Sequence, residues 1–199
     1  MTGWSRRSFL GAASLVALLS SAPGGAEVLR KLDPKDVPSP HMRKLMRTVA
    51  ELVIPTTDTP GAGALGADDF VLVALAHGLE GTRKPPAADP SFTPCLRADG
   101  SLDHAAWLDG KLGPDWLTLP PARQSEQLAA LDASAYKGET TAAPWRAIKA
   151  LILTGYYTSE VGGSRELNYE LVPGRFDPKV PVKPDTRAYS SDWTAVDFG

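Results

Sequence analysis

The stretch "SPHMRKLMRTVAELVIP", residues 39–55, decides the fold, because it carries a start signal, a regular apolar period and a stop signal. Ser39 can accept a hydrogen bond at the N-cap, Pro40 suits the first helical position, and Pro55 ends the run. Apolar side chains recur at three- and four-residue steps, at Met42, Leu45, Met46, Val49, Leu52 and Val53. The stretch therefore predicts an amphipathic helix packed on a core.

Four later stretches also carry helix signals, at residues 67–81, 100–113, 119–138 and 143–157. We expect Asp68 to cap the first of them and Ser101 the second, while prolines begin the other two. The 67–81 helix has apolar residues on almost all of its own faces, which predicts that it lies in the centre of the fold. The pattern indicates a mainly α fold: a small irregular helical domain with long loops at residues 56–66 and 82–94.

The C-terminal part has a different composition, with repeated prolines and glycines, and predicts an extended tail from about residue 163. Disordered tails are poor in aromatic residues, but this one contains Tyr169, Phe176, Tyr189 and Trp193. We therefore expect it to lie against an apolar surface, either its own helices or another chain. Residues 27–199 are predicted to form one domain with this tail.

The N-terminal 26 residues have the order of a signal peptide: positive charge, apolar run, then small residues with a cleavage point after Ala26. The apolar run, residues 9–19, is too short to span a bilayer, which takes about 20 residues. Two arginines followed one residue later by Phe-Leu resemble the twin-arginine signal, which exports folded proteins. The residues that carry this signal are Ser5, Arg6, Arg7, Phe9 and Leu10. An ordinary secretory signal with two chance charges is the alternative.

Composition and motifs exclude several classes of function. A formal net charge of -2 gives no support for nucleic-acid binding, which needs a basic face. The glycines of "GAGALG", residues 61–66, follow a predicted helix rather than a strand, so we interpret them as turn residues and not as a dinucleotide site. The three histidines show no metal-binding spacing. We therefore predict no catalytic, cofactor-binding or metal-ligating residue in this chain.

Two adjacent tyrosines, Tyr156 and Tyr157, stand with Glu160 at the end of the last predicted helix. Tyrosine combines an apolar ring with a polar tip and is enriched at interfaces. These side chains could line an interface or a pocket, or they could pack into the core.

Three stretches together resemble the gluconate 2-dehydrogenase subunit 3 family, the small subunit of membrane-associated, flavin-dependent sugar dehydrogenases. They are "ELVIPTTDTPGAGALG" (51–66), "ILTGYYTSEVG" (152–162) and "YELVPGRF" (169–176). The resemblance implies a large partner subunit of the glucose-methanol-choline oxidoreductase type that carries FAD and the substrate site. It also implies that the small subunit supplies the twin-arginine signal, and that a multi-haem cytochrome c completes the complex.

The first hypothesis is therefore a non-catalytic subunit that escorts and stabilises a flavoprotein in the periplasm, associated with the cytoplasmic membrane through the complex. Its partner interface would include Tyr156, Tyr157, Glu160 and the tail aromatics. An independent periplasmic enzyme or small-ligand-binding protein is the alternative. Cys95, the single cysteine, would be either a buried small residue or one half of a disulfide to the partner.

Overall fold

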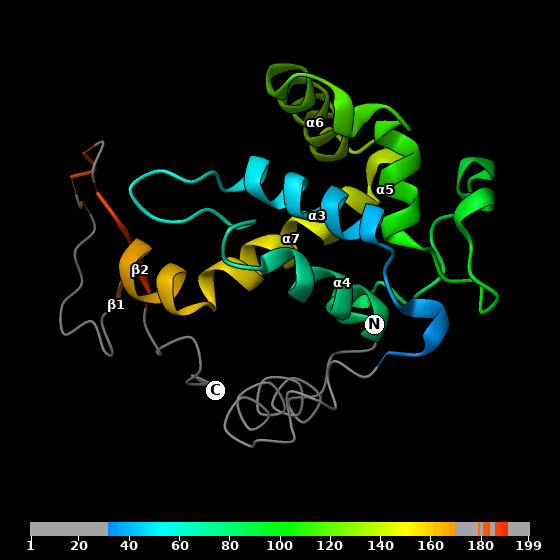
Figure 1. The fold of residues 1–199 in the computed structure, drawn as a ribbon, viewed down its shortest axis with the longest axis horizontal. Coiled ribbons are helices and arrows are strands. Elements are labelled where there is room, and N and C mark those ends of the chain that lie inside the picture. Colours follow the sequence, from blue (N-terminus) through cyan, green and yellow to red (C-terminus); the bar gives the residue numbers. More distant parts are fainter. Residues whose placement is uncertain (1–31, 170–178, 180, 184–185, 191–199) are drawn as a thin grey trace. The chain divides into compact units, whose positions relative to one another are not determined.

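The computed structural model describes residues 32–169, 179, 181–183 and 186–190 (Figure 1). The chain divides into two units, residues 1–38 and 39–199. The described part of the first unit holds one short 3₁₀ helix, η1 (Pro34–Asp36), in which the Asp33 carboxylate accepts from the backbone N–H of Lys35. The residues of the predicted export signal and its cleavage point lie outside the described residues.

The second unit is mainly helical, as predicted (Figure 1). Its α-helices, over the described residues, are α3 (Pro40–Val53), α4 (Ala67–His77), α5 (His104–Leu112), α6 (Pro121–Tyr136) and α7 (Pro144–Tyr157). Short 3₁₀ helices connect them: η2 (Leu79–Gly81), η3 (Pro90–Cys95), η4 (Trp116–Thr118) and η5 (Thr140–Ala142). After α7 come a π-helical turn, η6 (Gly162–Glu166), and two short parallel strands, β1 (Leu167–Tyr169) and β2 (Ala188–Ser190).

Helix α3 begins as its sequence predicts. The Ser39 hydroxyl accepts from the backbone N–H of Met42 at 3.1 Å, and Pro40 occupies the first turn. Leu45, Met46 and Val49 of the predicted stripe are buried. The stripe therefore faces the core.

Two predicted caps are wrong. Gly66, with φ of +76°, precedes α4, and Asp68 is the buried second residue of that helix. Asp103 caps α5, because its carboxylate accepts from the backbone N–H of Ala106, while Ser101 bonds to Asp99. In both cases the polar residue lies within three positions of the true cap.

The long loop predicted at residues 82–94 contains more structure than expected. Its second half forms η3, in which the Asp89 carboxylate accepts from the backbone N–H of Ser91 and Phe92 is buried. Proline suits the first position of a short 3₁₀ helix, and a carboxylate before it can cap the free backbone N–H groups. These two local features explain why the segment is helical. Strand β1 begins at Leu167, directly after η6, and most of the predicted tail lies outside the described residues.

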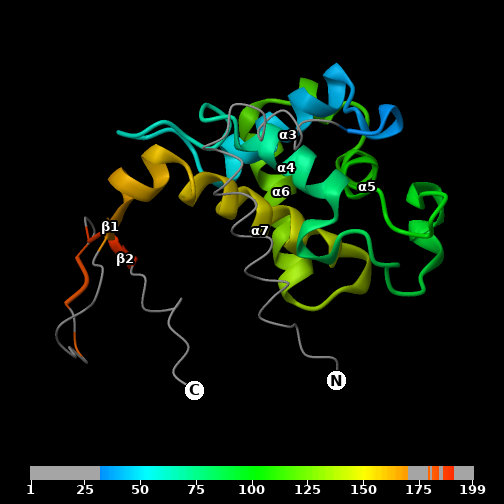
Figure 2. The ribbon, with the colours of Figure 1, turned by 90° about the horizontal axis from the view of Figure 1, so that it is seen from below.

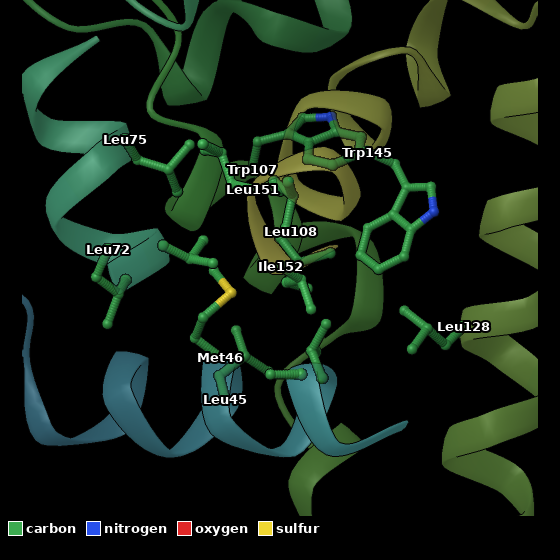
Figure 3. Close-up of a cluster of buried hydrophobic side chains, with 14 of the residues drawn as sticks. Leu45, Met46, Leu72, Leu75, Trp107, Leu108, Leu128, Trp145, Leu151 and Ile152 are labelled. Atoms are coloured by element: carbon green, nitrogen blue, oxygen red, sulfur yellow. The ribbon is translucent and has the colours of Figure 1, made fainter. Parts of the chain in front are cut away.

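Helix α7 lies at the centre of the second unit, where it packs against α3, α4, α5 and α6 (Figures 1 and 2). Helix α4, predicted to be central, packs against α3, α5 and α7. Side chains from all five α-helices meet in one apolar cluster (Figure 3). It includes Leu45, Met46, Leu72, Leu75, Trp107, Leu108, Leu128, Trp145, Leu151 and Ile152. This core holds the loop between α3 and α4 at one end of the unit.

Candidate functional site

The Glu51 carboxylate, in the last turn of α3, organises the loop that follows. One of its oxygens accepts from the backbone N–H of Thr56 at 2.8 Å and from the Thr56 hydroxyl at 2.6 Å. The other accepts from the backbone N–H of Ala64 at 3.3 Å. Partial burial raises the pKa of Glu51, but these hydrogen bonds outweigh it, so the pKa lies below its ordinary value. An ionised carboxylate therefore ties both ends of the loop to α3.

Two glycines are needed where the loop approaches this carboxylate. A Cβ atom on Gly61 would stand 2.6 Å from both Glu51 oxygens, and one on Gly63 would stand 2.7 Å from the carbonyl oxygen of Arg47. The backbone N–H of Gly61 also donates to the Thr56 hydroxyl at 2.9 Å. The interpretation of "GAGALG" as turn residues between two helices is consistent with this geometry, because Gly66 adopts a left-handed conformation at the start of α4.

The loop lies beside the end of α7 (Figures 1 and 2). The Tyr156 hydroxyl donates to the carbonyl oxygen of Pro60 at 3.3 Å, and the Thr59 hydroxyl donates to the Glu166 carboxylate in η6. Gly162 permits the turn after α7, because a Cβ there would collide with the carbonyl of Tyr156. The structure thus brings together two of the sequence stretches quoted above, residues 51–66 and 152–162.

The predicted interface residues have different positions at this end. Tyr156 is buried, whereas the Tyr157 side chain is 40% exposed and packs edge-to-face on the Tyr156 ring, with centroids 5.2 Å apart. Glu160 is exposed after α7, and Tyr189 is exposed in β2. Tyr169 lies in β1, where it pairs in register with Ser190. Phe176 and Trp193 lie outside the described residues.

Leu153 belongs to the same exposed surface but was not predicted from the sequence. It lies one helical turn before Tyr157, and its side chain is 36% exposed. A spacing of four residues places both side chains on one face of α7. This spacing is the signal that could have identified Leu153.

A groove of about 600 Å³ lies between α3, the loop and α6. It is lined by Arg47, Thr48, Glu51 and Leu52 of α3, by Gly63, Ala64 and Gly66, and by Gln124 of α6. Beside it, the Arg47 Nε–H donates to the Asp68 carboxylate at 3.1 Å. Asp68 is fully buried, which raises its pKa against the opposing attraction of the guanidinium. Neither Arg47 nor Gln124 belongs to a recognisable sequence motif, so neither was predicted as a site residue.

Cys95 lies at the end of η3 and is partly buried against the core. Burial, with a smaller contribution from the negative charge of Asp103, raises the pKa of its thiol.

The histidines do not converge: His41 bonds to Asp109 at 2.8 Å, and buried His104 bonds through Nδ1 to the carbonyl of Leu102. No group of three or more potential metal ligands occurs among the residues that the structure describes.

The family model for gluconate 2-dehydrogenase subunit 3 matches residues 40–174, from the first residue of α3 to beyond β1. The chain belongs to the gluconate 2-dehydrogenase subunit 3 family. The match covers the Glu51 loop, the groove and the end of α7 in a single span. Members of the gluconate 2-dehydrogenase subunit 3 family are subunits of a sugar dehydrogenase complex, so partner subunits are implied. No curated protein and no solved structure matches this chain.

Within the described part of the chain, no helix is both long enough and apolar enough to cross a bilayer.

Proposed function

We propose that this chain is a non-catalytic subunit that escorts and stabilises the FAD-bearing catalytic subunit of a sugar dehydrogenase. In this proposal Arg6 and Arg7 direct the folded pair to the twin-arginine translocation machinery. The complex works in the periplasm and is associated with the cytoplasmic membrane, with a multi-haem cytochrome c as a third subunit. The partner is an oxidoreductase of the glucose-methanol-choline type.

The observation that carries this proposal is the surface at the end of the second unit. The Glu51 loop and the end of α7 are joined by hydrogen bonds, and beside them Leu153 and Tyr157 are left exposed on one helix face. Interfaces are enriched in tyrosine, and large apolar side chains gain free energy when a partner covers them. Glu160 provides a polar group at the edge of this surface.

Export of the partner tests the escort function directly. Replacing both arginines by lysines retains the charge but removes the planar guanidinium pair. We expect the catalytic subunit, as well as this chain, to remain in the cytoplasm when Arg6→Lys and Arg7→Lys are combined. Normal export of the partner from the double variant would contradict the proposal.

Purification of the tagged chain from the envelope fraction tests the complex itself. We expect a larger chain to co-purify with flavin absorption that bleaches when an aldose or a glycoside is added. A lone, colourless protein with its own ligand affinity would instead favour an independent periplasmic enzyme or binding protein. The groove beside Arg47 would then be the first place to look for a ligand.

Cys95 remains the candidate for a disulfide to the partner. Its raised pKa lowers the thiolate fraction, and thiolate is the form that attacks a disulfide. Bridging would therefore be slow, although Cys95 is only partly buried in the structure. A non-reducing gel of the complex tests this, since a Cys95→Ser variant abolishes any band that contains both chains.

A further inference from the structure

Arg47 is held in a fixed orientation by a buried carboxylate. Its Nε–H donates to Asp68, whose side chain is fully buried in the first turn of α4. The Arg47 side chain itself is 60% exposed and lines the groove. Its two terminal amino groups have no hydrogen-bond acceptor among the described residues, so they can bind a group from outside this unit.

Lys44 adds a second positive charge on the same helix. It lies three residues before Arg47, which places the two side chains on neighbouring positions of α3, and it is exposed with no ion pair in the described part of the chain. Arg43, by contrast, pairs with Asp69 at 3.0 Å. This part of α3 therefore carries two positive side chains: Arg47, which lines the groove and is paired with Asp68 through Nε alone, and Lys44 beside it.

The acidic groups beside the groove, Glu51 and Asp68, are already engaged by contacts within this unit. Both oxygens of Glu51 already accept hydrogen bonds from the loop, and the Asp68 carboxylate lies beneath the guanidinium. Leu52, partly buried, provides an apolar wall, and Gly66 leaves open space, since nothing lies within 4 Å of a Cβ built on it. A chain segment that brings a negative charge and some apolar surface fits this lining.

We propose that the groove between α3, the Glu51 loop and α6 receives an acidic segment of the catalytic subunit, with a carboxylate bound by the two free amino groups of Arg47. This inference rests on the proposed function, because it requires a partner subunit. A guanidinium presents its N–H groups in a planar fork that matches the two oxygens of a carboxylate. Asp68 is then a positioning residue, which fixes the guanidinium before the partner arrives.

The test measures the dissociation constant of the purified complex as a function of salt concentration. We expect Arg47→Gln to raise the dissociation constant about tenfold or more and to flatten its salt dependence, because a charge pair is lost. Arg47→Lys keeps the charge without the fork and should give an intermediate value. Arg123→Gln is the matched control, since that arginine is 63% exposed and pairs with Glu126 on the surface of α6.

Arg47→Gln leaves Asp68 buried without its partner, so a folding defect has to be separated from a docking defect. The double variant Arg47→Gln with Asp68→Asn removes both charges, and we expect it to fold and still to bind the partner weakly. In the Arg47→Lys complex, a zero-length carbodiimide reagent should join the lysine at position 47 to an Asp or Glu of the catalytic subunit, identified by mass spectrometry. A link to a second copy of this chain would overturn the proposal.

The outcomes also separate this inference from the proposed function. If the wild-type chain holds no partner, both fail. If the wild-type chain binds its flavoprotein, and if Arg47→Gln and the double variant Arg47→Gln with Asp68→Asn bind it with the same dissociation constant as wild type, the groove proposal alone is wrong.

Discussion

The Tyr156 hydroxyl donates a hydrogen bond to the carbonyl oxygen of Pro60, at 3.3 Å and across 96 positions of sequence. This bond connects the last turn of α7 to the tip of the loop after α3. Together with the contact between Thr59 and Glu166, it fixes the loop on the surface where Leu153 and Tyr157 are exposed.

Tyr156→Phe removes the hydroxyl and retains the buried ring. We expect the free energy of unfolding to fall by about 1 kcal/mol, the usual net value of one hydrogen bond. Tyr156→Ala also leaves a cavity and should cost about 3–5 kcal/mol. Urea denaturation measures both, and equal losses for the two variants would show that the ring contributes nothing.

Gly61→Ala places a methyl group where the Glu51 carboxylate lies, 2.6 Å from both oxygens. We expect a loss of about 1–3 kcal/mol, because the loop must move away from α3. Gly110→Ala is the control: this glycine lies inside α5, and nothing stands within 4 Å of its added Cβ. Alanine there should stabilise the protein by about 0.5–1 kcal/mol, because it is the better helix former. Thermal or urea unfolding distinguishes the opposite signs.

The pKa of Glu51, held below its ordinary value of 4.5, makes the loop sensitive to acid. A carboxyl group with a lowered pKa in the folded state stabilises the fold above its ordinary pKa, and this contribution is lost as the pH falls through the folded value. We expect Glu51→Gln to be less stable than wild type at pH 7, and the difference in melting temperature to shrink below pH 4.5. A difference that stays constant down to pH 2 would contradict this role.

Periodicity predicted the helices well because burial follows the helical repeat. The same repeat could have separated the two tyrosines: Ile148 and Ile152 are buried, and Tyr156 continues their four-residue step, while Tyr157 follows Leu153 on the exposed face. The contacts of Glu51 could not be predicted in this way. Its polar position on α3 is typical of a solvated residue, and its donors come from a loop whose path no local rule determines.

Tyr157→Ala tests whether the exposed face of α7 is the partner interface. Because the ring is 40% exposed, we expect a loss of less than about 1 kcal/mol in the free energy of unfolding. Tyrosines at the centre of an interface commonly contribute 2 kcal/mol or more to binding, so the dissociation constant of the complex should rise about 30-fold. Tyr136→Ala is the control, since Tyr136 is 59% exposed at the end of α6 and its ring contacts Arg146 and Lys149 instead. Binding that is weakened equally by both variants would place the interface elsewhere, whereas a selective effect of Tyr157→Ala would assign it to the end of α7.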